Sequence, residues 1–126
     1  MKILGIDYGS RRIGLAISDE SLTLARELEI LHPKKFWAEI KNIIQENQVT
    51  KVVLGLPIGV KGNDTETTMQ ARAFSEKLKA TTNLAVEFID ERFSSAMAKH
   101  LPGGNNNVDS LAAQILLQNY LDKQKL

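Results

Sequence analysis

Short apolar runs recur along the chain at the length of β-strands. Residues 2–7 (KILGID) and 13–18 (IGLAIS) are rich in Ile and Leu and are joined by YGSRR, which suits a tight reversal, so they predict a β-hairpin. Residues 23–30 (TLARELEI) predict a third strand on weaker alternation. The run KVVLGL at 51–56 is typical of a parallel strand buried on both faces, and AVEFID at 85–90 predicts the fifth strand.

Apolar residues at helical spacing predict four helices around these strands. They are expected at 34–47, after Pro33 interrupts the chain, at about 64–81, at 94–101 and at 108 to about 122. The inner positions of the first two helices are Phe36, Trp37, Ile40, Ile43 and Ile44, then Thr67, Ala71, Phe74 and Leu78. The order βββαβαβαα implies an α/β fold in one domain over 1–126, with a mixed five-stranded sheet and helices on both faces.

Composition limits the function classes. The 126 residues are 43% hydrophobic, enough for one core, which excludes a two-domain enzyme. Lys and Arg number 16 against 15 Asp and Glu, a net charge of +1, so a nucleic-acid partner would need a local basic patch. The absence of cysteine excludes a disulfide framework, a thiolate nucleophile and cysteine-ligated metals. No segment has the apolar core of a signal peptide or a membrane span, so we expect a cytoplasmic protein.

Acidic residues end two of the predicted strands. Asp7 closes the first strand, where its carboxylate either caps the turn amides of Gly9 and Ser10 or belongs to a site. Asp90 and Glu91 end the fifth strand. Adjacent strand residues point to opposite faces, so at most one of these two faces the same site as Asp7. Taken alone, the pair is better explained as structural, because acidic residues are favoured before a helix.

Asp109 is the most informative acid, because it projects onto the apolar side of the last helix, between Leu116 and Tyr120. The opposite, polar side holds Ser110, Gln114 and Gln118. Contact with solvent does not explain why a carboxylate lies on the apolar side of a helix. Asp109 could cap the helix, but the asparagines at 105–107 can serve as caps instead, so a functional site is favoured.

The three acidic positions could converge at one edge of a mixed sheet. Converging carboxylates repel one another unless they share a cation, and hard oxygen ligands select Mg²⁺ or Mn²⁺. The chemistry that this arrangement implies is metal-assisted phosphoryl transfer, with water as the nucleophile in phosphodiester hydrolysis.

Candidate substrate contacts give a weaker signal, since each is also an ordinary turn or surface residue. Arg11 and Arg12 follow Gly9 in the first hairpin, and Lys61 lies in the Gly-rich loop after the fourth strand, where a cation and exposed amides could meet phosphates. Arg72 could act likewise, although an ion pair with Glu76 is its default role.

Other side chains of chemical interest are better explained by the fold. His32 and His100 lack a second ligand at suitable spacing and are not assigned a metal. The pair Phe36 and Trp37 is expected to be core of the first helix, not a base-stacking platform.

Several motifs together resemble the YqgF/RuvX family. They are GIDYGSRRIGLAISD at 5–19, VVLGLPIGVKG at 52–62, the AR-F pattern at 71–74, FIDERFSS at 88–95 and VDSLAAQILLQNYL at 108–121. They cover nearly the whole chain in the family's order. The resemblance implies an RNase H-like fold and a nuclease, of the kind that processes pre-16S rRNA or resolves Holliday junctions.

The resemblance also implies the site. The family's acids fall on Asp7, Glu91 and Asp109, which chooses Glu91 over Asp90 and makes these three the expected catalytic and Mg²⁺- or Mn²⁺-binding residues. Family members usually carry a longer basic stretch before the last helix. Here residues 96–107 contain only Lys99 and His100 as basic groups, which predicts a weaker grip on nucleic acid or one supplied by a partner in a homodimer.

Two other function classes compete with a nuclease for structured RNA or branched DNA. An actin-like or sugar-kinase-like ATP-binding protein also has a D-x-G pattern after its first strand, but that architecture needs two such domains. A catalytically silent nucleic-acid-binding module would keep the fold, but it would gain nothing from three carboxylates facing phosphates of the same charge.

Overall fold

A computed structural model describes residues 1–9, 11–56, 66–90 and 108–124. The strands are β1 (Lys2–Asp7), β2 (Ile13–Ser18), β3 (Ala25–Leu31), β4 (Val49–Leu56) and β5 (Ala85–Asp90). The helices are α1 (Pro33–Glu46), α2 (Glu66–Thr82) and α4 (Val108–Lys123). The helix expected at 94–101 lies outside the described residues. No helix in the described ranges combines the length and the apolar character that crossing a membrane requires.

The strands form one mixed sheet in the order β3-β2-β1-β4-β5. The antiparallel pairs are β1 with β2 and β2 with β3, whereas β4 runs parallel to both β1 and β5. Ile6 is in register with Leu54, and Leu54 with Phe88. The C-terminal ends of β1, β4 and β5 therefore lie together, at what we call the carboxyl edge of the sheet. The predicted α/β architecture is confirmed.

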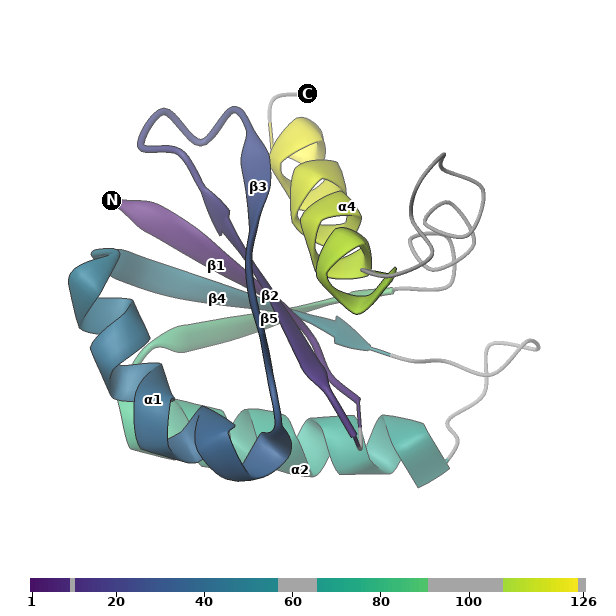
Figure 1. The fold of residues 1–126 in the computed structure, drawn as a ribbon. Helices are drawn as coiled ribbons and strands as arrows, with labels where there is room; N and C mark the ends of the chain where they lie inside the picture. The colour runs from purple at the N-terminus through teal and green to yellow at the C-terminus, as the bar shows by residue number, and fades with distance from the viewer. Residues whose placement is uncertain (10, 57–65, 91–107, 125–126) are drawn as a thin grey trace.

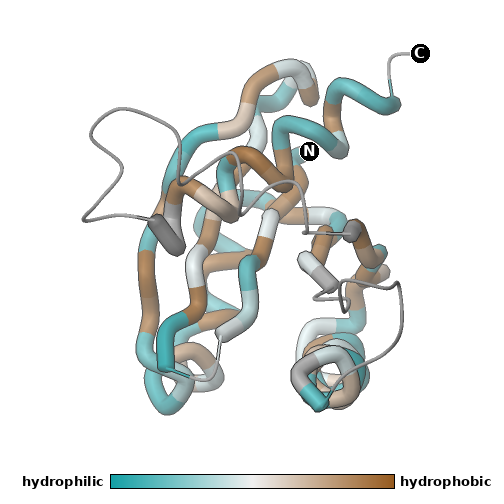
Figure 2. The backbone as a smooth tube through the Cα atoms, turned by 90° about the vertical axis from the view of Figure 1, so that its right-hand side faces the viewer, coloured by the Kyte–Doolittle hydropathy of each residue, from teal (hydrophilic) through white to brown (hydrophobic). Residues whose placement is uncertain are grey.

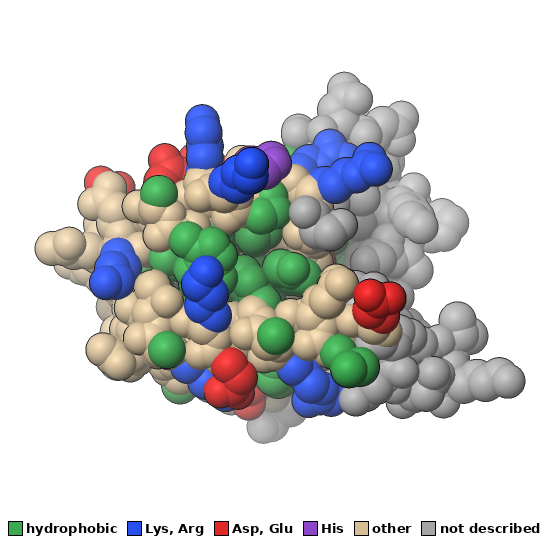
Figure 3. Space-filling view, turned by 90° about the horizontal axis from the view of Figure 1, so that it is seen from below, with side chains coloured by type: hydrophobic (Ala, Val, Ile, Leu, Met, Phe, Trp, Pro, Cys, Tyr) green, Lys and Arg blue, Asp and Glu red, His purple; other side chains and the backbone are tan. Residues whose placement is uncertain are grey.

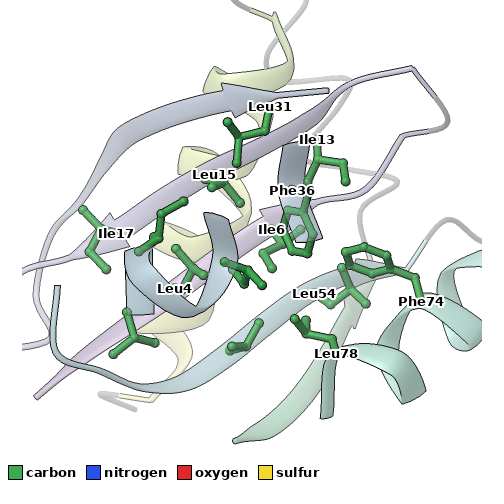
Figure 4. Close-up of a cluster of buried hydrophobic side chains, with 14 residues drawn as sticks. Leu4, Ile6, Ile13, Leu15, Ile17, Leu31, Phe36, Leu54, Phe74 and Leu78 are labelled. Atoms are coloured by element: carbon green, nitrogen blue, oxygen red, sulfur yellow. The ribbon is translucent and has the colours of Figure 1, made fainter. Parts of the chain in front are cut away.

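Helices cover both faces of the sheet, with α1 and α2 on one face and α4 on the other (Figure 1). The larger core cluster lies under α1 and α2 (Figure 4) and consists of Leu4, Ile6, Ile13, Leu15, Ile17, Leu31, Phe36, Ile40, Ile43, Val49, Val52, Leu54, Phe74 and Leu78. The α4 cluster consists of Ile3, Ala16, Ala25, Val53, Ala113, Leu116, Leu117, Tyr120 and Leu121. Apolar positions colour much of the strands in Figure 2, as expected for a sheet buried on both faces.

The two faces of the sheet differ in the size of their side chains. Alternation in β1 sends Leu4 and Ile6 to the larger cluster and Ile3 to α4, and in β2 the residue that joins the α4 cluster is Ala16. Small residues on this face let α4 approach closely. At Gly5, an added Cβ would lie only 2.8 Å from the Cβ of Leu117.

Several element boundaries differ from those predicted; β4, for example, begins at Val49, two residues earlier than expected. β3 begins at Ala25, two residues later than expected, because the amides of Thr23 and Leu24 donate to the carboxylate of Asp19, at 2.8 and 3.2 Å, in the turn before it. Pro33 does not interrupt the chain but is the first residue of α1, where its missing N–H costs nothing. His32 caps this helix through Nδ1, which accepts from the amide of Lys34 at 3.1 Å.

Candidate functional site

Asp7 is the last residue of β1 and lies half-buried at the carboxyl edge. It shares the alternation of Ile3 and Gly5, which both meet α4, so its position belongs to the α4 face of the sheet. The sequence predicted the first acid of the site at the end of the first strand, and the structure adds the face of the sheet on which it lies.

The packing of α4 on β1 fixes which end of the helix approaches Asp7. Gly5 lies against Leu117 and the carbonyl oxygen of Ala113, whereas Tyr120 packs with Ile3 near the start of β1. Moving along β1 toward Asp7 therefore means moving along α4 toward its first turn. Figure 1 shows α4 with its N-terminal end toward the carboxyl edge. Asp109, the second residue of α4, belongs to that turn; its side chain lies outside the described residues.

The alternation of β5 is also defined by its neighbours. Glu87 accepts a hydrogen bond from the hydroxyl of Tyr120 on α4 at 2.6 Å, and Ile89 packs against the α4 cluster. Phe88 packs against the larger cluster on the opposite face. Odd-numbered positions of this strand therefore belong to the face that carries Asp7.

The remaining predicted residues, which are the catalytic Glu91 and the substrate contacts, lie in several places. Glu91 and Lys61 lie outside the described residues. Gly9 and the exposed Arg11 and Arg12 form the turn after β1, at the carboxyl edge. Gly9 also has a structural role, since an added Cβ would lie 2.6 Å from the carbonyl oxygen of Arg12.

Arg72 lies on α2, across the sheet from α4. Its guanidinium carbon is 5.8 Å from the ring centroid of Phe88, near the end of β5. Glu76, which was expected to pair with Arg72, lies 3.5 Å from the ammonium of Lys79. The structure thus brings Asp7, the first hairpin turn and the start of α4 to one edge, with Arg72 on the other side of the sheet.

No group of three acidic, histidine or cysteine side chains that could hold a metal occurs in the described parts of the chain. Of the three carboxylates expected to do so, only that of Asp7 belongs to those parts. Asp7 is half-buried at the carboxyl edge of the sheet, and its carboxylate is a hard oxygen donor of the type that Mg²⁺ and Mn²⁺ prefer.

A second polar cluster lies at the opposite edge of the sheet. The ammonium of Lys51 donates to the hydroxyl of Tyr120 and lies 2.8 Å from a carboxylate oxygen of Glu87. The hydrogen bonds from Lys51 and Tyr120 lower the pKa of Glu87, and the hydrogen bonds that Lys51 makes with Glu87 and Tyr120 raise the pKa of Lys51. Sequence reasoning missed this cluster, because its members are far apart in the chain and only the strand register and α4 bring them together.

Comparison with known proteins decides the family. A family model for RuvX, described as Holliday junction resolvase, matches residues 1–123. The chain belongs to the RuvX family. Two relatives, from Dictyoglomus turgidum and Bordetella pertussis, carry the name "Putative pre-16S rRNA nuclease" and are each 37% identical to this RuvX chain. The first alignment covers 100% of this chain and 97% of the relative, and the second covers 95% and 92%.

Solved structures confirm the fold of this RuvX chain. RuvC of Thermus thermophilus in complex with a Holliday junction matches it with a TM-score of 0.66 at 15% identity, over 99% of this chain and 96% of that one. The Fowlpox virus resolvase matches with a TM-score of 0.57 at 14% identity, over 98% and 99%. Both are RNase H-like, so the fold expected from the sequence is confirmed.

Proposed function

We propose that this RuvX chain is a Mg²⁺- or Mn²⁺-dependent endonuclease that hydrolyses phosphodiester bonds in structured RNA and processes the 5′ end of pre-16S rRNA in the cytoplasm. The observation that carries the proposal is the meeting of Asp7 and the first turn of α4 at one edge and on one face of an RNase H-like sheet. The substrate follows the names of the relatives from Dictyoglomus turgidum and Bordetella pertussis.

Asp7, Glu91 and Asp109 are the proposed catalytic and metal-holding residues. Asp7 and the start of α4 share the α4 face, and Glu91 follows Ile89 by two positions, so it continues the alternation of the residues in β5 that meet α4. A cation bound there would offset the charge of the scissile phosphate and favour ionisation of the attacking water. The carboxylates would hold the cation, and one of them or a phosphate oxygen would orient the attacking water.

The proposed substrate contacts surround this edge. The turn containing Gly9, Arg11 and Arg12 follows Asp7 directly and offers two guanidinium groups to phosphates. Lys61 and Arg72 are proposed to contact the strand further from the scissile bond. Because these groups bind the backbone and not the bases, they give affinity without sequence preference.

A four-way DNA junction is the second candidate substrate. It is favoured by the description of the RuvX family and by the structural match to RuvC in complex with a Holliday junction. Symmetric cleavage of a junction would require two active sites related by a two-fold axis, so this alternative includes a homodimer.

The test is a comparison of the two substrates with the same protein preparation. End-labelled precursor of 16S rRNA and a labelled four-way DNA junction are incubated with Mg²⁺, Mn²⁺ or EDTA. The proposal predicts cleavage of the RNA near the mature 5′ end only with metal. Cleavage of the junction alone would establish the second candidate, and binding without cleavage of either substrate would establish a catalytically silent module.

A further inference from the structure

An aromatic groove lies on the face formed by α1 and α2. It has a volume of about 340 Å³ and is lined by Tyr8, Trp37, Gln70, Ala73, Phe74 and Lys77. The ring centroid of Phe74 is 4.5 Å from that of Tyr8 and 5.2 Å from that of Trp37. Figure 3 shows hydrophobic side chains between the two helices on this face, with Lys and Arg side chains around them.

Core packing does not account for the whole groove. Phe74 is 7% exposed and belongs to the larger cluster, but Tyr8 and Trp37 are only half-buried and line the groove. The sequence predicted Phe36 and Trp37 as core, and this is confirmed fully for Phe36 alone.

A cation completes the groove. The ammonium of Lys77 lies 4.3 Å from the ring centroid of Trp37, and Lys77 makes no ion pair within the described residues. A half-buried ring beside an ammonium that forms no ion pair in the described part of the chain is complementary to a flat, neutral base joined to an anionic phosphate.

The groove begins where the candidate active site begins. Tyr8 directly follows Asp7 at the end of β1, and because Asp7 belongs to the α4 face, Tyr8 packs on the opposite face against Phe74. An RNA strand that passed over the carboxyl edge from the α4 face to the opposite face would reach the aromatic groove.

We propose that this groove binds an unpaired base of the RNA strand: the ammonium of Lys77 moves from the Trp37 ring to an adjoining phosphate, and the base stacks on Trp37 and Tyr8 where they line the groove. The choice of RNA as the occupant rests on the proposed function. Stacking on an aromatic ring tolerates any base, so the groove would hold single-stranded RNA next to the scissile bond without reading its sequence.

Trp37 is the only tryptophan in the chain, so its fluorescence reports directly on the groove. An oligouridylate is titrated into the full-length protein in EDTA, which removes catalysis from the measurement. The proposal predicts saturable quenching of Trp37 that weakens as salt rises. Trp37→Leu should weaken binding roughly 5- to 150-fold, the range of one lost stacking contact, measured by anisotropy of labelled RNA.

Lys77→Ala is a second variant that should perturb the fold less than Trp37→Leu. The side chain of Lys77 is exposed, so its removal should leave folding unchanged. It should weaken binding and reduce the salt slope by about 0.7. Lys79→Ala on the same helix is the matched control, since Lys79 pairs with Glu76 and does not line the groove. Circular dichroism confirms that each variant is folded.

The outcomes separate this proposal from the nuclease assignment. RNA binding with unchanged Trp37 fluorescence, and with wild-type affinity in Trp37→Leu and Lys77→Ala, would overturn the groove and leave the nuclease intact. Quenching without cleavage of any substrate would support the groove while the proposed function fails. Trp37 fluorescence and sedimentation are also measured at several protein concentrations without RNA. If the fluorescence changes over the concentrations at which dimers form, the occupant of the groove is a second copy of the chain and the RNA proposal is wrong.

Discussion

Gly5 and Leu117 meet where α4 crosses β1. An ideal Cβ on Gly5 would lie 2.8 Å from the Cβ of Leu117 and 3.4 Å from the carbonyl oxygen of Ala113. The first of these separations is shorter than real Cβ contacts, and the Cβ of Leu117 is fixed to the helix backbone, so α4 would have to move. The close crossing therefore sets how near the first turn of α4 lies to Asp7.

Gly5→Ala should lower the free energy of unfolding by about 1–3 kcal/mol, the usual cost of overpacking a core. This loss should appear even though alanine stiffens the unfolded chain, which by itself would stabilise by roughly 0.4–1 kcal/mol. Urea denaturation measures the difference. A variant as stable as the wild type would show that α4 does not pack on β1 as described.

Gln118 connects α4 to the beginning of β3. Its side-chain oxygen accepts from the amide of Ala25 at 2.8 Å, and its side-chain nitrogen donates to the carbonyl oxygen of Thr23 at 2.9 Å. Gln118→Ala should cost about 1–3 kcal/mol, because the amide of the buried Ala25 loses its partner. Gln118→Glu keeps the acceptor, but as a carboxylate it would face the carbonyl oxygen of Thr23 and Oδ1 of Asp122, so it should cost less than Gln118→Ala only at acidic pH, where it is protonated. Thermal or urea unfolding of both variants at acidic pH checks this order, and the reverse order there would contradict it.

Glu87 should make the free energy of unfolding depend on pH in the acidic range. Its pKa in the folded protein is lowered by hydrogen bonds from Lys51 and Tyr120, so its contribution is present above its ordinary pKa of 4.5 and is lost as pH falls through the lowered value. The side chains of Lys51 and Glu87 are 34% and 49% exposed, so solvent screens the pair and the contribution should be about 0.5–1 kcal/mol.

Glu87→Gln is the variant that tests this dependence. It should lose that contribution at about pH 7 and show a smaller further loss on acidification than the wild type, measured by urea denaturation from about pH 7 to pH 3. Equal acid sensitivity of the two proteins would show that Glu87 does not gain from its neighbours.

The sheet and helices could be predicted because each element carries its own pattern. β2, for example, places Ile13, Leu15 and Ile17 on one face, and the structure buries all three in one cluster. The start of β3 could not be predicted, because the hydrogen bonds of Asp19 to the turn amides override weak alternation. The sequence also offered no sign that Gln114 and Gln118, on the polar side of the last helix, would hydrogen-bond to the backbone of Ala25 at the start of β3.

The part of the site that could be predicted from the sequence is the part that depends on the position of a single residue in its strand. Asp7 stands at a strand end in the sequence, and the structure confirms its place at the carboxyl edge. The roles of Glu91 and Asp109 stay predictions, because they depend on side chains outside the described residues. The aromatic groove was not predicted, because Tyr8, Trp37 and Phe74 come from three separate elements that only the packing of α1 and α2 on the sheet brings together.

The most direct test of the central claim is the rate of precursor rRNA cleavage by the wild type and by Asp109→Asn, each with Mg²⁺ and with EDTA. The amide keeps the size of the carboxylate but removes the charge that a cation requires, and Asp7→Asn serves as an independent second variant. We predict that EDTA abolishes wild-type cleavage and that each variant loses about 100-fold or more in rate at unchanged stability. Cleavage by Asp109→Asn at the wild-type rate, or cleavage that continues in EDTA, would contradict the account.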